Sequence, residues 1–162
     1  MKKYSVFLIL LFFCLNLSAK QYMLQKPDSI PTLELSFKLT DEGKHVTNYY
    51  LLIYCDTNAA DTLFIQKGKV SYLYLRYNHN YSLRYVKQGY RDRVLIVRTG
   101  FANRKNMQFD YEIELVKENE MANTFADLPV AIIRYDLNKK RFDYSRTYHK
   151  QVRQKFSARK KN

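Results

Sequence analysis

Residues 70 to 99 read VSYLYLRYNHNYSLRYVKQGYRDRVLIVRT, and this stretch decides the expected fold. Two sets of side chains alternate in three runs within it, at residues 72–75, 81–86 and 94–97, the last of which is apolar throughout. A period of two that is rich in aromatic and β-branched residues is typical of strands whose two faces differ in solvent contact. The residues between the runs, Asn78 to Asn80 and Gly89 to Asp92, tolerate the backbone of tight turns. The stretch therefore predicts three antiparallel strands joined as a meander.

The rest of the chain adds further strands of the same kind. Residues 33–39 alternate strictly, and residues 46–55 are apolar on both faces, which predicts a central strand. Shorter runs follow at residues 62–66, 109–115 and 129–135. We therefore expect a mainly β protein, an antiparallel β-sandwich of about seven to eight strands followed by a basic C-terminal helix.

The order of three features along this region is similar to a known module. Gly68 precedes an aliphatic strand, Tyr81 and Leu83 lie in the next strand, and Gly89 and Tyr90 follow it. Over roughly residues 33–99 this order resembles the carboxypeptidase regulatory-like, or transthyretin-like, β-sandwich module. The resemblance implies a prealbumin-like sandwich in an exported bacterial protein. Some transthyretin-like proteins are hydrolases with a His/Arg site and a C-terminal Tyr-Arg-Gly-Ser, and this chain lacks that ending.

The N-terminus has the three parts of a secretory signal. Two lysines follow Met1, an apolar run covers residues 6–15, and small residues end at Ala19. The run is interrupted at Asn16 and is shorter than the roughly 18 residues of a membrane span. The sequence therefore predicts a signal peptide at residues 1–19, export to the periplasm, the outer membrane or the medium, and no transmembrane segment after cleavage. An uncleaved membrane anchor is the alternative.

The 143 residues after the signal suit a single domain. We expect a leader at residues 20–32, the β-sandwich at residues 33–135, and a basic, partly helical segment at residues 136–162. Removal of the signal takes Cys14 away and leaves Cys55 alone, so no internal disulfide can form. We expect Cys55 to be a buried strand residue, with a reactive thiol as the alternative.

Positive charge is concentrated at the C-terminus, where the period also changes. Residues 139–162 hold ten basic residues and a single acidic one, Asp143, whereas residues 20–138 are nearly balanced. Ser145 can cap a helix, and an apolar residue recurs at every fourth position from Tyr144 to Phe156. Six basic residues form the candidate anionic-surface binding face: Arg146, Lys150, Arg153, Lys155, Arg159 and Lys160. The expected partners are lipopolysaccharide, lipid headgroups or an envelope protein, and a tail that only aids solubility is the alternative.

Aromatic residues are the other unusual feature of the composition. The chain holds 15 tyrosines and ten phenylalanines but no tryptophan. Most are expected in the core, although a groove for a polysaccharide or a peptide is an alternative. Four tyrosines are candidates for a partner face or for covering one face of a sheet: Tyr72, Tyr74, Tyr85 and Tyr90.

The sequence shows no catalytic motif. The three histidines are scattered, and no zinc-binding His-Glu-x-x-His, Cys-x-x-Cys pair or phosphate-binding glycine loop occurs. Asp110, Glu112 and Glu114 share one face of a strand, where a solvated sheet edge is favoured over a calcium site. We therefore predict no catalytic residue, no cofactor and no metal, in a non-enzymatic exported protein that binds or scaffolds in the cell envelope. The alternatives are a nucleic-acid or polysaccharide binding module, with export arguing against nucleic acid, and a hydrolase or metal-dependent enzyme. A pocket converging on His79 or on the acidic face of Asp110, Glu112 and Glu114 would favour the enzyme.

Overall fold

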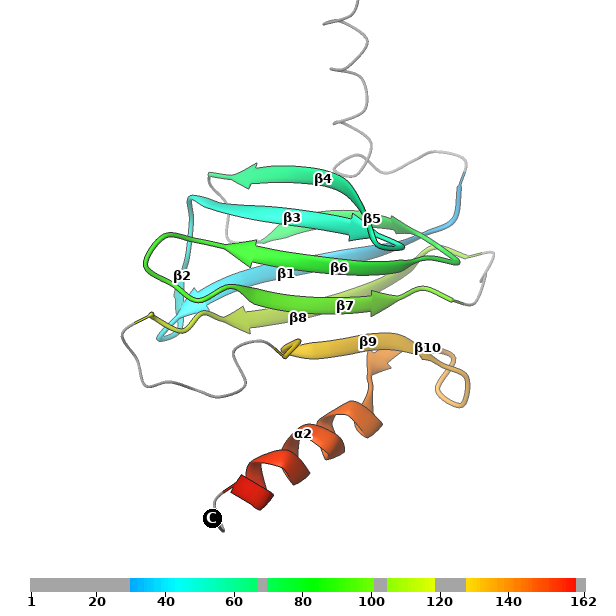
Figure 1. Ribbon diagram of the computed structural model, residues 1–162. Helices are drawn as coiled ribbons and strands as arrows, with labels where there is room; N and C mark the ends of the chain where they lie inside the picture. The colour runs from blue at the N-terminus through cyan, green and yellow to red at the C-terminus, as the bar shows by residue number, and fades with distance from the viewer. Residues whose placement is uncertain (1–29, 67–69, 101–104, 119–127, 160–162) are drawn as a thin grey trace, which may run out of the picture.

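The computed structural model describes residues 30–66, 70–100, 105–118 and 128–159, without the side chains of residues 60 and 153–159 (Figure 1). The predicted signal peptide, most of the predicted leader, and Lys160 lie outside the described residues. The described part holds ten strands and a C-terminal helix. They are β1 (Thr32–Asp41), β2 (Lys44–His45), β3 (Tyr49–Cys55), β4 (Asn58–Ile65), β5 (Ser71–Arg76), β6 (Asn80–Val86), β7 (Arg93–Arg98), β8 (Met107–Glu114), β9 (Ala131–Asp136), β10 (Arg141–Tyr144) and α2 (Arg146–Arg159).

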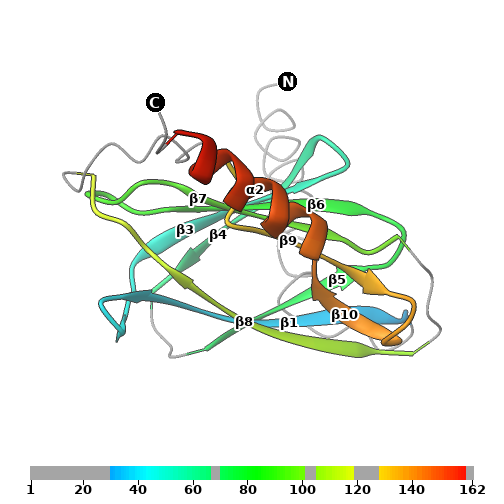
Figure 2. The same ribbon diagram turned by 90° about the horizontal axis from the view of Figure 1, so that it is seen from below.

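The strands form two sheets that face each other (Figures 1 and 2). In the smaller sheet, β1 pairs with β2, β5 and β8, and β8 runs along most of its length. The larger sheet has the order β10-β9-β7-β6-β3-β4. The mainly β, sandwich-like fold is therefore confirmed. The sheets are mixed rather than purely antiparallel, because β1 runs parallel to β8 and β7 runs parallel to β9. β7 and β9 are parallel because the chain passes from β7 to β8 in the opposite sheet and then enters β9 in the same direction as β7.

The predicted meander over residues 70–99 is wrong in one connection. β5 pairs with β1 in the smaller sheet, whereas β6 pairs with β3 and β7 in the larger one. The chain therefore crosses between the sheets at residues 77–79 instead of folding back as a hairpin. Tyr77 anchors this crossing: its side chain is buried and its hydroxyl lies 3.1 Å from the Thr32 carbonyl and 2.9 Å from the Lys105 carbonyl. Asn78 completes the change of direction with a φ of +66°.

Aromatic side chains join the two sheets across the core. Phe37 of the smaller sheet stacks on Tyr111 with ring centroids 5.7 Å apart and meets the edge of Tyr85 from the larger sheet at 5.8 Å. The hydroxyls of Tyr85 and Tyr111 share a short hydrogen bond in this buried layer. Aliphatic residues that are at most 1% exposed surround the aromatic layer: Leu33, Leu35, Leu51, Ile53, Leu73, Leu75, Leu83, Leu95, Val97 and Ile133. The core is therefore built from the alternate positions that the period of two assigns to one face.

The strand predicted to be central, residues 46–55, corresponds to β3, which lies between β4 and β6. Among the described residues, only one of its faces packs against the other sheet. Leu51 and Ile53 are fully buried, whereas Tyr50 is 50% exposed and packs against Phe64 of β4 with ring centroids 4.8 Å apart. The apolar residues on the outer face therefore pack on neighbouring strands rather than under a second layer.

The sandwich extends past the predicted boundary at residue 135. β10 pairs with β9, and Phe142 in β10 is 3% exposed and stacks on Tyr77 across the crossing point. β10 is too short for its sequence to show the alternation that identifies a strand. In the structure its one buried residue, Phe142, holds it in the sheet. Only α2 then remains as an appendage, lying outside the sheets next to β9 (Figures 1 and 2). Within the described residues, no helix is long and apolar enough to cross a membrane.

Candidate functional site

The predicted C-terminal helix is present as α2, and Ser145 caps its start. The Ser145 hydroxyl accepts a bond from the Tyr148 amide at 3.4 Å, and the Ser145 carbonyl accepts one from the His149 amide at 3.2 Å. The Ser145 amide in turn donates to the Ile132 carbonyl of β9 at 2.7 Å. The first turn of α2 is therefore fixed to the edge of the larger sheet.

One side of α2 faces the sandwich and the other faces solvent. Tyr148 and Val152 are half-buried, and the Tyr148 hydroxyl donates a short hydrogen bond to the Pro129 carbonyl. Arg146 and Lys150 are exposed, as the predicted binding face requires. Three further members, Arg153, Lys155 and Arg159, lie in α2 without described side chains, and Lys160 lies outside the described residues.

The helix itself carries only positive charge. Its 14 residues include five basic residues and no acidic residue, in the first turn or elsewhere. Asp143, the one acidic residue of the tail, forms a short ion pair with Lys139 in the turn before β10. This contact with Lys139 also lowers the pKa of the Asp143 carboxyl. The charge of Asp143 is therefore already paired outside α2.

The four candidate tyrosines do not share one face. Tyr72 is 49% exposed and Tyr74 is half-buried, and both lie on the outer side of β5. Tyr85 must be withdrawn from the partner face, because it points into the core and is 1% exposed. Tyr90 lies in the connection from β6 to β7, where its hydroxyl donates to the Asp41 carboxylate at 2.7 Å. The partner face reduces to the adjacent pair Tyr72 and Tyr74.

The acidic residues of β8 pair with the neighbouring strand. Glu112 forms an ion pair with Lys38 at 2.6 Å, which lowers the pKa of its carboxyl, and it also accepts from the Thr40 hydroxyl at 3.2 Å. Asp110 accepts a short hydrogen bond from the Ser36 hydroxyl. β8 lies at the edge of its sheet, so the charged face occupies the predicted sheet edge.

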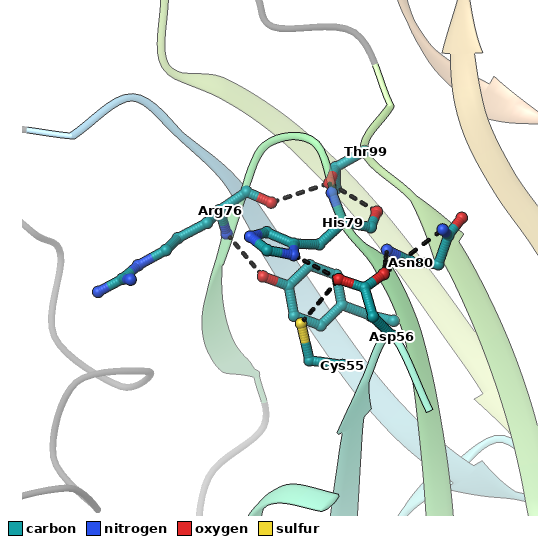
Figure 3. A network of polar contacts seen from close by, with 7 residues as sticks. Cys55, Asp56, Arg76, His79, Asn80 and Thr99 are labelled. Atoms are coloured by element: carbon teal, nitrogen blue, oxygen red, sulfur yellow. Dashed lines mark hydrogen bonds and ion pairs between the residues drawn. The ribbon is translucent and has the colours of Figure 1, made fainter. Parts of the chain in front are cut away.

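A cluster that the sequence did not reveal lies at one end of the larger sheet, where Cys55, Asp56 and His79 meet (Figure 3). Cys55 ends β3, and Asp56 and Thr57 form a tight turn into β4 with φ angles of +48° and +81°. Two positive φ angles are typical of the hairpin turns that follow strand twist. His79 comes from the crossing, directly before β6, which pairs with β3. The pairing of two strands therefore brings the three side chains together.

The Asp56 carboxylate stands at the centre of the cluster. Its Oδ2 atom lies 2.6 Å from His79 Nδ1 and 3.8 Å from Cys55 Sγ, and its Oδ1 atom accepts from the Asn80 amide at 2.8 Å. The hydrogen bond with His79 lowers the pKa of the Asp56 carboxyl. All three potential ligand atoms of the cluster lie within 4.8 Å of one another.

The Cys55 thiol is not arranged as an activated nucleophile. Its pKa is raised, first by burial and then by the negative charge of Asp56. In thiol hydrolases an imidazole abstracts the thiol proton and an acid orients the imidazole, whereas here the carboxylate contacts both other groups. The side chain is half-buried rather than fully buried as predicted. The arrangement does not favour the hydrolase interpretation.

An open hollow of about 640 Å³ is lined by Thr57, Asn80 and Arg98 among other residues, but none of the three cluster residues lines it. Sequence reasoning missed the cluster because 23 positions separate Asp56 from His79, and only the strand pairing brings them together. The sequence offered one signal: two asparagines flank His79 in the crossing, and a separate strand ends in a cysteine, Cys55. No protein-family model and no curated protein matches this chain, so any functional proposal depends on its own geometry.

Proposed function

We propose that this chain is a non-enzymatic, exported β-sandwich protein of the bacterial cell envelope, and that α2 is its contact with an anionic lipid surface. The observation that carries the proposal is the charge of α2, which has five basic residues and no acidic one over 14 residues. The signal-like residues 1–19 support export, because they combine a charged start, a short apolar core and small residues at the end.

The way α2 is attached supports a surface contact. Ser145 and Tyr148 fix its first turns to β9 and to the segment before it, while Arg146 and Lys150 remain exposed. The sandwich therefore holds the helix on its outside without neutralising it. By contrast, basic and acidic residues are nearly balanced in number over residues 20–138, and some of them form ion pairs, such as Lys38 with Glu112.

The spacing of the charges favours an extended array of phosphates over a single bound molecule. Basic residues recur along the whole of α2, from Arg146 to Arg159, instead of converging on one point. Each lysine or arginine close to an anionic membrane contributes about 1 kcal/mol to binding, and the contribution falls off within a Debye length. Lipopolysaccharide and phospholipid headgroups share this phosphate chemistry.

Binding to lipid vesicles tests the proposal. The chain from Lys20 to Asn162 is floated with phosphatidylcholine vesicles alone, with added phosphatidylglycerol, or with added lipopolysaccharide. A helix variant carries glutamine at five basic positions: Arg146, Lys150, Arg153, Lys155 and Arg159. A matched control carries glutamine at five exposed basic positions elsewhere: Lys44, Arg98, Lys105, Arg134 and Arg141.

We expect binding to the anionic vesicles only, and a loss of about 30-fold or more in the helix variant at low salt. The matched control has the same net charge as the helix variant. Its affinity for the vesicles should stay within about threefold of that of the parent chain, because the proposal depends on the position of the charges rather than on their number. Equal losses in the two variants would contradict a role for α2. Binding of a single-stranded oligonucleotide in preference to either anionic vesicle would favour the nucleic-acid alternative.

A further inference from the structure

We propose that Cys55, Asp56 and His79 form a binding site for a thiophilic divalent metal ion of the Zn²⁺ class, held by Sγ, Oδ2 and Nδ1. The site shares no residue with α2 and does not depend on the function proposed for that helix. No metal was expected from the sequence, because Cys55 and Asp56 lie at the end of β3 whereas His79 lies in the crossing before β6.

The three donors suit one kind of ion. Thiolate, imidazole and carboxylate are the ligand types of protein zinc sites, with bond lengths of about 2.3, 2.0 and 2.0 Å. A thiolate selects against Ca²⁺ and Mg²⁺, which prefer oxygen ligands in larger numbers. On binding, the thiol proton of Cys55 and any proton shared by Asp56 and His79 pass to solvent, and the ion takes their place.

The distances leave room for such an ion after a small adjustment. Bond lengths of this size in a tetrahedron place the ligand atoms about 3.3 to 3.5 Å apart. The sulfur and the carboxylate oxygen are already 3.8 Å apart, and no two ligand atoms are more than 4.8 Å apart. The oxygen and the imidazole nitrogen, at 2.6 Å, must separate. The side chains of Asp56 and His79 are 45% and 39% exposed, so they have space to do so.

The backbone around the ligands is held independently of any ion. The Asn80 amide donates to Asp56 Oδ1 at 2.8 Å, and this bond orients the carboxylate while Oδ2 faces the other two ligands (Figure 3). The His79 amide donates to the Thr99 hydroxyl at 3.0 Å, and the His79 carbonyl accepts from the Thr99 amide at 2.9 Å. Supporting contacts of this kind fix the orientation of metal ligands and raise affinity.

Three protein ligands leave a fourth position for water or for another small ligand, as in open zinc sites. The competing explanation is a solvent-exposed ion pair that fixes the turn after β3 and needs no ion. The two explanations differ in whether the thiol takes part.

Cobalt titration separates these explanations, because Co²⁺ bound by a thiolate gives a sulfur-to-metal charge-transfer band in the near ultraviolet. The reduced, metal-free chain from Lys20 to Asn162 is used, in which Cys55 is the only cysteine. The variants are Cys55→Ser, Asp56→Asn and His79→Gln, and the matched control is His45→Gln, a change of an exposed histidine in β2. Circular dichroism and urea unfolding confirm that each variant is folded.

We expect one Co²⁺ per chain, the charge-transfer band, and displacement by added Zn²⁺. Cys55→Ser should abolish the band, and the other two ligand variants should weaken affinity by about 100-fold, while His45→Gln leaves it unchanged. Absence of the band in the parent chain would overturn the proposal. So would His79→Gln retaining full affinity in a folded protein, because the site would then lack its imidazole.

Discussion

The Thr99 hydroxyl is expected to be worth more to stability than its size suggests. The side chain is 0% exposed, and its oxygen accepts from the His79 amide at 3.0 Å while lying 2.8 and 2.9 Å from the carbonyls of Arg76 and His79. It therefore holds the crossing between the two sheets from the end of β7. Thr99→Val preserves the shape of the side chain but leaves a buried amide and a carbonyl without this partner.

The magnitude follows from the two hydrogen bonds that the hydroxyl can make at once, one accepted and one donated. A net value of about 0.5 to 1.5 kcal/mol for each, with a further cost for an unsatisfied buried donor, predicts that Thr99→Val lowers the free energy of unfolding by about 2 to 3 kcal/mol. Thr99→Ser keeps the hydroxyl and removes one methyl group, so we expect a loss of about 1 kcal/mol.

Urea unfolding followed by circular dichroism measures this difference. With a slope of about 2 kcal/mol per molar urea, Thr99→Val should lower the midpoint by about 1 to 1.5 M without a change of slope. A loss below about 0.5 kcal/mol in Thr99→Val would refute the reasoning. A serine variant as unstable as the valine variant would also refute it, because the methyl group rather than the hydroxyl would then be the stabilising part.

Two further predictions concern the core and its tyrosines. Leu83→Ala removes a fully buried side chain and should lower the free energy of unfolding by about 2 to 5 kcal/mol. Phe64→Ala on the outer face, where the ring is 48% exposed, should lower it less. Urea midpoints compare the two variants. Burial raises the pKa of Tyr85 and Tyr111 above the ordinary value near 10, so their contribution to stability is complete below about pH 10 and is lost as the pH rises further. In Tyr111→Phe the free energy of unfolding should therefore fall less steeply with pH above 10, and an unchanged slope would contradict the assignment.

The strands were predictable because their signal is local. In residues 33–39 and 81–86, alternate side chains had to be apolar for one face to be buried, and both segments are strands with that pattern. Their neighbours were not predictable, because alternation says which side chains face inward but not which strand lies alongside. Tyr77 decided that question for β5 and β6, and its role depends on carbonyls of Thr32 and Lys105, which are distant in sequence.

The same alternation accounts for which tyrosines are buried. Tyr81, Leu83 and Tyr85 occupy one set of alternate positions, opposite Ser82 and Arg84, so the period already assigned Tyr85 to the buried face. In β5 the leucines occupy the inward positions, which places Tyr72 and Tyr74 outside. Tyrosines that alternate with inward-facing aliphatic residues of the same strand point outward, and of the four candidates only these remain for a partner face.

The cluster of Cys55, Asp56 and His79 could not be found in this way, because it depends on register rather than on period. The register of β3 on β6 places Leu51 opposite Tyr85 and Ile53 opposite Leu83, all within the core. The same register sets Cys55 opposite Tyr81 and brings the Asp56 amide to within 2.9 Å of the Asn80 carbonyl. A slip by one residue would turn the apolar face of β3 toward solvent. Burial of the core therefore fixes the position of the cluster, in which Cys55 packs against the core while Asp56 and His79 remain largely outside it.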